Sequence, residues 1–187
     1  HVIAAFFGAA KLGIVTVMLN YRLQAAELQY IVEHSDTKLL IHDEVFKEVT
    51  SQLEVTAIGT DELQKLYKIT AQEPLYVTAD HEPILIMYTS GTTGKPKGAL
   101  LSHINLQAAS IGLSHTIDWW EQDRFLMVAP FFHIGGFAPL ITNIHVGATM
   151  ILMEDFHPVD AWNAIPIHHI TTMMTVPAML SFMLRTF

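Results

Sequence analysis

Short apolar runs alternate with helical patterns along almost the whole of this 187-residue chain. Residues 25–34 show the helical kind, because Leu28, Ile31 and Val32 fall on one face of a helix. Residues 124–128 show the extended kind, a short apolar run. Strands that alternate with helices form parallel β-α units, whose ligands gather at the carboxyl ends of the strands. The pattern therefore predicts an α/β fold, with mainly parallel sheets flanked by helices.

The same patterns predict a helix or a strand for most segments of the chain. The predicted helices cover residues 2–12, 25–34, 43–52, 61–68, 103–116, 133–145, 158–165 and 178–186. The predicted strands cover residues 14–18, 38–42, 55–58, 84–87, 99–101, 124–128, 148–152 and 170–176. We expect Gly147 and Pro166 to end the helices before them, and residues 70–83, which contain two prolines, to form a connecting loop.

Composition excludes several classes of function. The net charge is −8, so the chain has no basic face for nucleic acid, and with no Cys it has no disulfide framework and no thiolate chemistry. Hydrophobic residues make up 51% of the chain, which fits buried parallel strands and also fits a piece that has lost a partner surface. We therefore expect self-association, or a homo-oligomer, when this piece is studied alone.

The first residues leave a membrane alternative to be weighed. Residues 2–19 are nearly all apolar, but Lys11 lies in their middle and Gly13 interrupts them, which favours a helix followed by a buried strand over a membrane span. The chain opens with His1 inside this apolar pattern and carries no signal-peptide pattern. We expect a piece of a longer cytoplasmic protein without a transmembrane segment, and peripheral contact with a membrane stays open.

Residues 88–98 read Y-T-S-G-T-T-G-K-P-K-G and follow the apolar run 84–87. Glycines let the backbone approach a ligand, hydroxyls and free N–H groups donate hydrogen bonds, and Lys95 and Lys97 add positive charge. Such a segment suits a polyphosphate, although a flexible surface loop rich in Gly and Thr is the alternative. The candidate binding residues are Thr89, Ser90, Gly91, Thr92, Thr93, Gly94, Lys95, Pro96 and Lys97.

This segment differs from the G-x-x-x-x-G-K-[ST] phosphate loop. Thr89 stands at the position of the first Gly, and Pro96 stands where that loop has Ser or Thr. Because Pro96 disfavours a helical conformation at Lys95, the loop does not lead directly into a helix. We predict a strand, a donor-rich loop and a second extended run.

A second motif, residues 129–137, reads A-P-F-F-H-I-G-G-F. His133 follows a strand end there and can donate to an anionic carboxylate or phosphate, while a core histidine bonded to a backbone carbonyl is the alternative. If strand 124–128 lies beside the loop, both motifs face one cleft. The histidines lack zinc-ligand spacing, so we predict no metal site, and the chain has no G-x-S-x-G nucleophile elbow.

The segment 88–98 resembles the signature loop of the AMP-forming adenylating enzymes: acyl-CoA and aryl-CoA synthetases, luciferases and the adenylation domains of peptide synthetases. Residues 7–13, 20–23, 27–28 and 170–180 are also similar to segments of acyl-CoA synthetases. The resemblance implies part of the large N-terminal domain of such an enzyme. Within it we expect first β-α units and a connector (1–83), the phosphate-binding loop with its strands (84–103), and further units with an acyl-pocket motif (104–187).

The resemblance also implies an activity. The parent protein would use ATP and Mg²⁺ to adenylate a carboxylic acid, fatty or aromatic, and then transfer the acyl group to coenzyme A. His133 would be catalytic, between the nucleotide site and the acyl pocket, and Phe131, Phe132 and Phe137 would lie near an acyl tunnel, although each is also a plausible core residue.

Several alternatives remain open within and beyond this family. A fatty-acyl-CoA ligase is favoured, and an aryl-CoA ligase, a luciferase-like enzyme and a nucleotide-binding module without catalysis are the alternatives. The chain has no Y-G-x-T-E segment and no T-G-D aspartate, which the family uses for Mg²⁺, adenine and ribose. We therefore expect this piece alone to be catalytically inactive.

Overall fold

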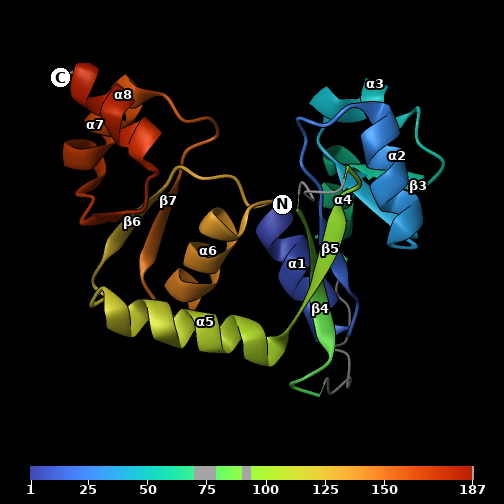
Figure 1. Cartoon of the computed structure of the whole chain (residues 1–187), viewed down its shortest axis with the longest axis horizontal. Helices are drawn as coiled ribbons and strands as arrows, with labels where there is room; N and C mark the ends of the chain where they lie inside the picture. Colours follow the sequence, from blue (N-terminus) through green and yellow to red (C-terminus); the bar gives the residue numbers. More distant parts are fainter. Residues whose placement is uncertain (70–78, 90–93, 187) are drawn as a thin grey trace. The chain divides into compact units, whose positions relative to one another are not determined.

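The computed structural model describes residues 1–69, 79–89 and 94–186, in two compact units, His1–Ser102 and His103–Phe187 (Figure 1). Both units combine helices with small sheets, which confirms the predicted α/β class. Residues 70–78, most of the predicted connecting loop, lie outside the described residues.

The first unit contains a three-stranded sheet in the order β1-β4-β5. β1 (Thr16–Met18) and β4 (Pro83–Thr89) run parallel, whereas β4 and β5 (Lys97–Ser102) are antiparallel, with Thr89 opposite Lys97. The β4–β5 pair is the antiparallel exception among the described strands, whose sheets are mainly parallel as predicted. The reason is length: a parallel pair needs a crossover of a dozen or more residues, and the segment between these strands permits only a hairpin.

A second, two-stranded parallel sheet in this unit joins β2 (Leu39–His42) to β3 (Thr56–Gly59). The helices of the unit are α1 (Val2–Lys11), α2 (Ala25–His34), α3 (Lys47–Thr50), which follows a 3₁₀ turn at Glu44–Phe46, and α4 (Thr60–Leu66). The expected helix and strand between residues 2 and 19 are thus confirmed as α1 and β1. Among the described residues no helix is long and apolar enough to cross a membrane.

Helix α2 is anchored at both ends. At its start the Gln24 backbone N–H donates to the Glu27 carboxylate over 2.9 Å, half of a capping box. Its apolar face buries Leu28 and Val32 against Leu40 and Leu53. At its other end the Ser35 hydroxyl donates to the carbonyl of Ile31. This helix therefore has a fixed position over β2.

The second unit is built on a parallel sheet in the order β7-β6-β8. Its strands are β6 (Arg124–Met127), β7 (Thr149–Leu152) and β8 (Thr172–Met173). Its helices are α5 (His103–Thr116), α6 (Ile134–Val146), α7 (Pro158–His168) and α8 (Pro177–Arg185). Leu126 at the centre of the sheet and Val128 beyond it are buried with Ala161, Ala164 and Met183.

Two boundaries in this unit were predicted wrongly. α7 continues through Pro166 to His168, because a proline in the last turn removes only one helical hydrogen bond while Ala161 and Ala164 keep the helix packed. The strand predicted over 170–176 pairs only at Thr172 and Met173, because a β-branched run becomes a strand only where a neighbour is in register. The predicted end of α6 is confirmed, with Gly147 in the left-handed conformation (φ 77°).

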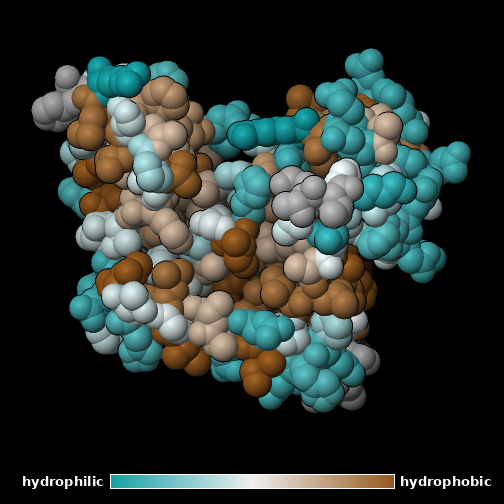
Figure 2. Space-filling model, viewed as in Figure 1, coloured by the Kyte–Doolittle hydropathy of each residue, from teal (hydrophilic) through white to brown (hydrophobic). Residues whose placement is uncertain are grey.

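Hydrophobic side chains reach the surface over α7 and α8 (Figure 2). The most exposed of them are Ile167, Leu180, Phe182 and Leu184. Scattered apolar residues are normal on a protein surface, but a group of large ones on neighbouring helices marks a surface that another segment or another molecule can cover.

Candidate functional site

The hairpin of β4 and β5 presents the candidate phosphate loop. Thr89 ends β4 and Lys97 begins β5, and the Thr89 hydroxyl donates to the Lys97 carbonyl over 3.4 Å. Both side chains are exposed. Ser90, Gly91, Thr92 and Thr93 lie outside the described residues, so the hairpin defines the base of the loop and its returning side.

The returning side has the features that a ligand-facing backbone needs. Gly94 has φ 99°, a backbone conformation that favours glycine. A Cβ added there would meet no heavy atom within 4 Å, so the backbone angle and not steric crowding explains the glycine. Lys95 is exposed and Pro96 is half-buried. As predicted, no helix follows Lys95, because β5 begins at Lys97.

Gly98 has a different reason to be glycine. A Cβ there would lie 2.8 Å from Cγ2 of Ile86 and 3.2 Å from Cζ of Tyr88. The absent side chain leaves room for the Tyr88 ring, which crosses the facing strand at this position. The last glycine of the motif therefore serves the packing of the hairpin.

Sequence reasoning missed two residues of α2 that contact this hairpin. The Tyr30 hydroxyl donates to the Pro96 carbonyl over 3.4 Å, and the Lys95 ammonium lies 5.3 Å from the centre of the Tyr30 ring. Nδ1 of His34 is 2.7 Å from the Tyr88 hydroxyl, and the His34 and Tyr30 rings are stacked with centres 5.4 Å apart. The only signal in the sequence was their i, i+4 spacing on the helix, beside its apolar face.

Tyr88 has an altered acidity in this setting. Burial raises the pKa of its phenol, the Tyr30 ring adds to that increase, and a hydrogen bond with Ser35 opposes it. The net effect keeps the hydroxyl protonated through neutral pH, and a protonated hydroxyl can both donate and accept at His34.

His133 lies where the second motif placed it, just beyond the carboxyl end of β6. Its backbone N–H donates to the Pro130 carbonyl over 3.2 Å, and its own carbonyl accepts from the N–H groups of Gly136 and Phe137 over 2.9 Å. It is the N-cap residue of α6, and its side chain makes no capping hydrogen bond. The imidazole is exposed and lies beside the Phe132 ring, with centres 4.5 Å apart. It is therefore not a core histidine.

Close backbone packing holds this turn. A Cβ on Gly136 would collide with the carbonyl oxygens of Ala129 and Pro130, so the start of α6 touches the chain that leaves β6. Phe132 and Phe137 are buried, and Phe131 is half-buried. The two buried rings are core residues of the unit, whereas the His133 imidazole is exposed.

Lys95 and His133 belong to different units. Their convergence on one cleft thus stays a prediction, as do the roles of the individual site residues. In the described parts of the chain no group of three or more His, Cys, Asp or Glu side chains could hold a metal ion.

Comparison with known proteins identifies the family of this chain. The model of the family described as AMP-binding enzyme matches residues 1–187. The chain belongs to the AMP-binding enzyme family, as its motif 88–98 predicted.

Relatives of this chain include ligases of organic acids. The chain is 35% identical to the long-chain-fatty-acid–CoA ligase FadD13 of Mycobacterium tuberculosis, over 95% of this chain and 37% of that protein. It is 38% identical to the fatty acid–[acyl-carrier-protein] ligase ScoC of Streptomyces coeruleorubidus, over 98% of this chain and 38% of that protein. The chain therefore spans little more than a third of the length of these relatives.

Solved structures show the same fold. The N-terminal domain of FACL13 from Mycobacterium tuberculosis superposes with a TM-score of 0.90 and 33% identity, over 97% of this chain and 48% of that one. The o-succinylbenzoate–CoA synthetase MenE of Bacillus subtilis, solved with ATP and magnesium, superposes with a TM-score of 0.88 and 30% identity, over 100% of this chain and 39% of that one.

Proposed function

We propose that this chain supplies the polyphosphate-binding part of an ATP-dependent, AMP-forming acid–thiol ligase. The observation that carries the proposal is a hairpin in an AMP-binding family member whose returning side presents Gly94 in an open conformation and exposes Lys95 and Lys97. Thr89, Ser90, Gly91, Thr92, Thr93 and Pro96 complete the proposed binding segment.

In the proposed reaction a carboxylate oxygen of the acid attacks the α-phosphorus of ATP. The bond from that phosphorus to the bridging oxygen breaks, and pyrophosphate leaves with the electron pair. Lys95 and Lys97 stabilise the negative charge that grows on the leaving group, which lowers the barrier more than it tightens substrate binding. His133, an exposed imidazole at the start of α6, donates a hydrogen bond to the reacting carboxylate or phosphate. A thiol then attacks the acyl-adenylate, and AMP leaves.

Magnesium fits this proposal as a companion of ATP. The ion would arrive on the phosphates, where it neutralises charge on the leaving group. The MenE relative was solved with both ATP and magnesium.

The acid and the thiol follow from the relatives and remain proposals. A fatty acid is favoured, because FadD13 and ScoC act on fatty acids, and an aromatic acid is the second candidate, because 2-succinylbenzoate–CoA ligases of Bacillus also match. Coenzyme A is the favoured acceptor thiol, and the name of ScoC adds an acyl-carrier protein as a second candidate.

We also propose that the 187-residue chain alone binds ATP without turnover. The division into residues 1–83, 84–103 and 104–187 is part of the same proposal. The polyphosphate segment by itself does not position the other reacting groups. Self-association through the hydrophobic surface over α7 and α8 is proposed as well, and light scattering across a concentration series measures it.

Isothermal titration of the chain with magnesium-ATP, with pyrophosphate and with AMP tests the proposal. We expect ATP and pyrophosphate to bind, and Lys95→Gln and Lys97→Gln each to weaken both ligands about tenfold, as the loss of a charge-assisted contact does. Lys65→Gln, on an exposed helix end of the same unit, is the matched control. Ligand affinity that is the same for all three variants would disprove the polyphosphate assignment.

A further inference from the structure

The last turn of α2 carries a pair of aromatic side chains that contact both sides of the hairpin. Tyr30 meets the returning side at Lys95 and Pro96, and His34 meets the outgoing strand at Tyr88. The partners lie 54 and 66 residues away along the sequence. One helix turn therefore joins the two sides of the hairpin just where the candidate ligand segment leaves and returns.

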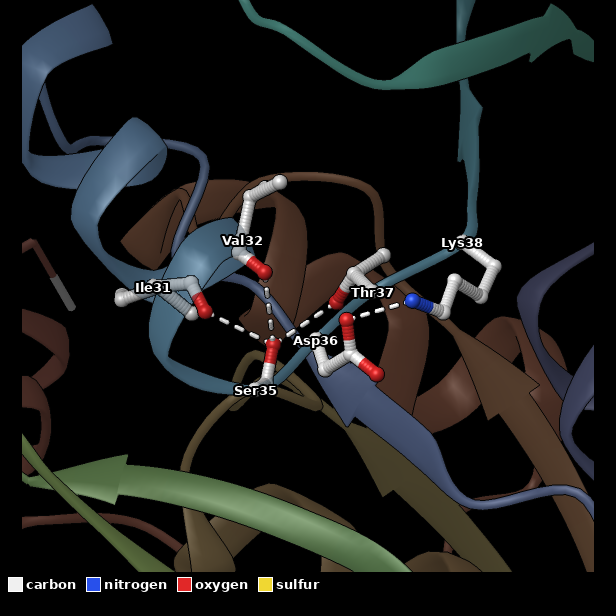
Figure 3. A network of polar contacts seen from close by, with 6 residues as sticks. All are labelled: Ile31, Val32, Ser35, Asp36, Thr37 and Lys38. Atoms are coloured by element: carbon white, nitrogen blue, oxygen red, sulfur yellow. Dashed lines mark hydrogen bonds and ion pairs between the residues drawn. The ribbon is translucent and has the colours of Figure 1, made fainter.

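This helix turn is itself held in place. The Ser35 hydroxyl donates to the Ile31 carbonyl over 2.7 Å and also lies 2.7 Å from the Thr37 hydroxyl, which closes the end of α2 (Figure 3). Asp36 follows in the left-handed conformation and pairs with Lys38. The Tyr30 and His34 rings therefore project from a fixed backbone, a condition that a positioning residue must meet.

Tyr30 makes two separate contacts with consecutive residues. Its ring faces the Lys95 ammonium at 5.3 Å, within the range of a cation–π interaction, and its hydroxyl bonds to the next carbonyl, that of Pro96. The His34 ring stacks on the Tyr30 ring and is itself held by a hydrogen bond with the Tyr88 hydroxyl. The stacked ring therefore limits rotation of the Tyr30 ring. An exposed lysine has many rotamers, and this arrangement restricts them.

We propose that Tyr30 is a positioning residue, which presents the Lys95 ammonium to an anionic polyphosphate, with His34 as its support. The inference rests on the proposed function and deepens it: it assigns part of the affinity for the nucleotide to a residue on α2, outside the loop motif. Tyr30 does not touch the ligand and acts through Lys95.

A double-mutant cycle tests the proposal on the 187-residue chain, with magnesium-ATP affinity as the readout. Tyr30→Leu removes ring and hydroxyl, and we expect about a two- to fivefold weaker affinity, the size of an exposed cation–π interaction. In the Lys95→Gln background the same change should have no effect, because the charge it positions is gone. Tyr30→Phe keeps the ring and should bind within about twofold of the wild type. Tyr67→Leu, on an exposed tyrosine of the same unit, is the matched control.

A second measurement needs no ligand. Side-chain protons of Lys95 that lie over an aromatic ring resonate upfield, so NMR should show an upfield shift in the wild type and in Tyr30→Phe, and its loss in Tyr30→Leu. If the chain does not bind ATP at all, the proposed function fails, and this shift still decides whether Tyr30 positions Lys95.

Three results would overturn the inference. An equal loss of affinity from Tyr30→Leu in both backgrounds would show a merely structural role. A gain in affinity would show that the ring holds Lys95 away from the ligand. Absence of the upfield shift in the wild type would show that the ring and the ammonium are not in contact. Should Tyr30→Leu fail to fold, a Tyr30→Phe shift equal to that of the wild type supports the proposal, and its absence contradicts it.

Discussion

The hairpin of the first unit and the strand–helix turn of the second both place a candidate motif after a buried strand, but different contacts stabilise them. At the turn, Gly136 packs on the carbonyl oxygens of Ala129 and Pro130, so the contact is local and made by backbone. At the hairpin, Tyr30 and His34 reach Pro96 and Tyr88 from α2, so the contacts are distant in sequence and made by side chains.

This difference has a consequence for stability. A steric contact between backbone atoms tolerates almost no added volume. An exposed side-chain contact, aromatic or hydrogen-bonded, contributes only a little to the free energy of unfolding, so its loss has a small effect. We therefore expect the turn to respond sharply to volume added at Gly136, and the hairpin to respond weakly to the loss of a single side-chain contact.

The largest effect is expected for Gly136→Ala. The new Cβ would collide with two carbonyl oxygens, and relief requires the first turn of α6 to move, at a cost of about 3 kcal/mol in the free energy of unfolding. Urea unfolding followed by circular dichroism measures it. Gly135→Ala is the matched control, because a Cβ there meets nothing within 4 Å, and it should leave stability unchanged or raise it slightly. Equal effects of the two substitutions would refute the steric account.

His133→Ala should separate chemistry from folding at the same turn. The imidazole is exposed and makes no capping bond, so stability should change by less than about 0.5 kcal/mol. If the proposed function holds, formation of acyl-adenylate by the parent protein should fall about 100-fold, as when a hydrogen-bond donor to the transition state is removed. Pyrophosphate release measures this loss. An unchanged rate would remove His133 from the proposed site.

Asp123 provides an intermediate case, in which side-chain contacts join the amino ends of β6 and β8. The pKa of its carboxyl is lowered because it accepts from the Trp120 backbone N–H over 2.8 Å, from the Thr171 hydroxyl over 2.7 Å and, more weakly, from Thr172, while slight burial opposes these bonds. Since the folded pKa lies below the unfolded one, this stabilisation is present at neutral pH and is lost as pH falls below about 4.

Asp123→Asn should therefore lower the free energy of unfolding by about 1 kcal/mol at pH 7, a value that allows for solvent screening. The difference in stability between this variant and the wild type should shrink in acid. Unfolding midpoints at pH 7 and pH 3 measure both. Asp155→Asn, on an exposed residue that follows β7, is the matched control. A difference that persists unchanged in acid would show that the carboxylate charge is not the cause.

A small loss of stability is expected for Tyr88→Phe at the hairpin. It removes the hydroxyl that bonds to His34, at a cost of about 0.5–1 kcal/mol. Burial raises the pKa of this phenol, so its contribution is present below about pH 10 and is lost as pH rises above that value. The wild type should thus lose stability in alkali more steeply than Tyr88→Phe, in thermal unfolding between pH 8 and pH 11. Parallel curves would contradict the assignment.

The sequence anticipated much of the fold because its local signals were strong. The helix 25–34 was predicted with its observed bounds, since its apolar face has a clear period and its caps are local. The predicted end of α6 at Gly147 was right for the same reason. The strand over 170–176 was overestimated, because strand length depends on a neighbour that the sequence does not name.

For the candidate site, the sequence by itself determined which segments are proposed to carry the chemistry: an apolar run, a donor-rich loop with two lysines, and a histidine that follows a strand. These are properties of consecutive residues, which a motif can express. Only the tertiary structure decided that α2 joins both sides of the hairpin, that Gly98 makes room for Tyr88, and that His133 is exposed. Such contacts depend on how distant segments pack, and no local pattern of residues encodes that packing.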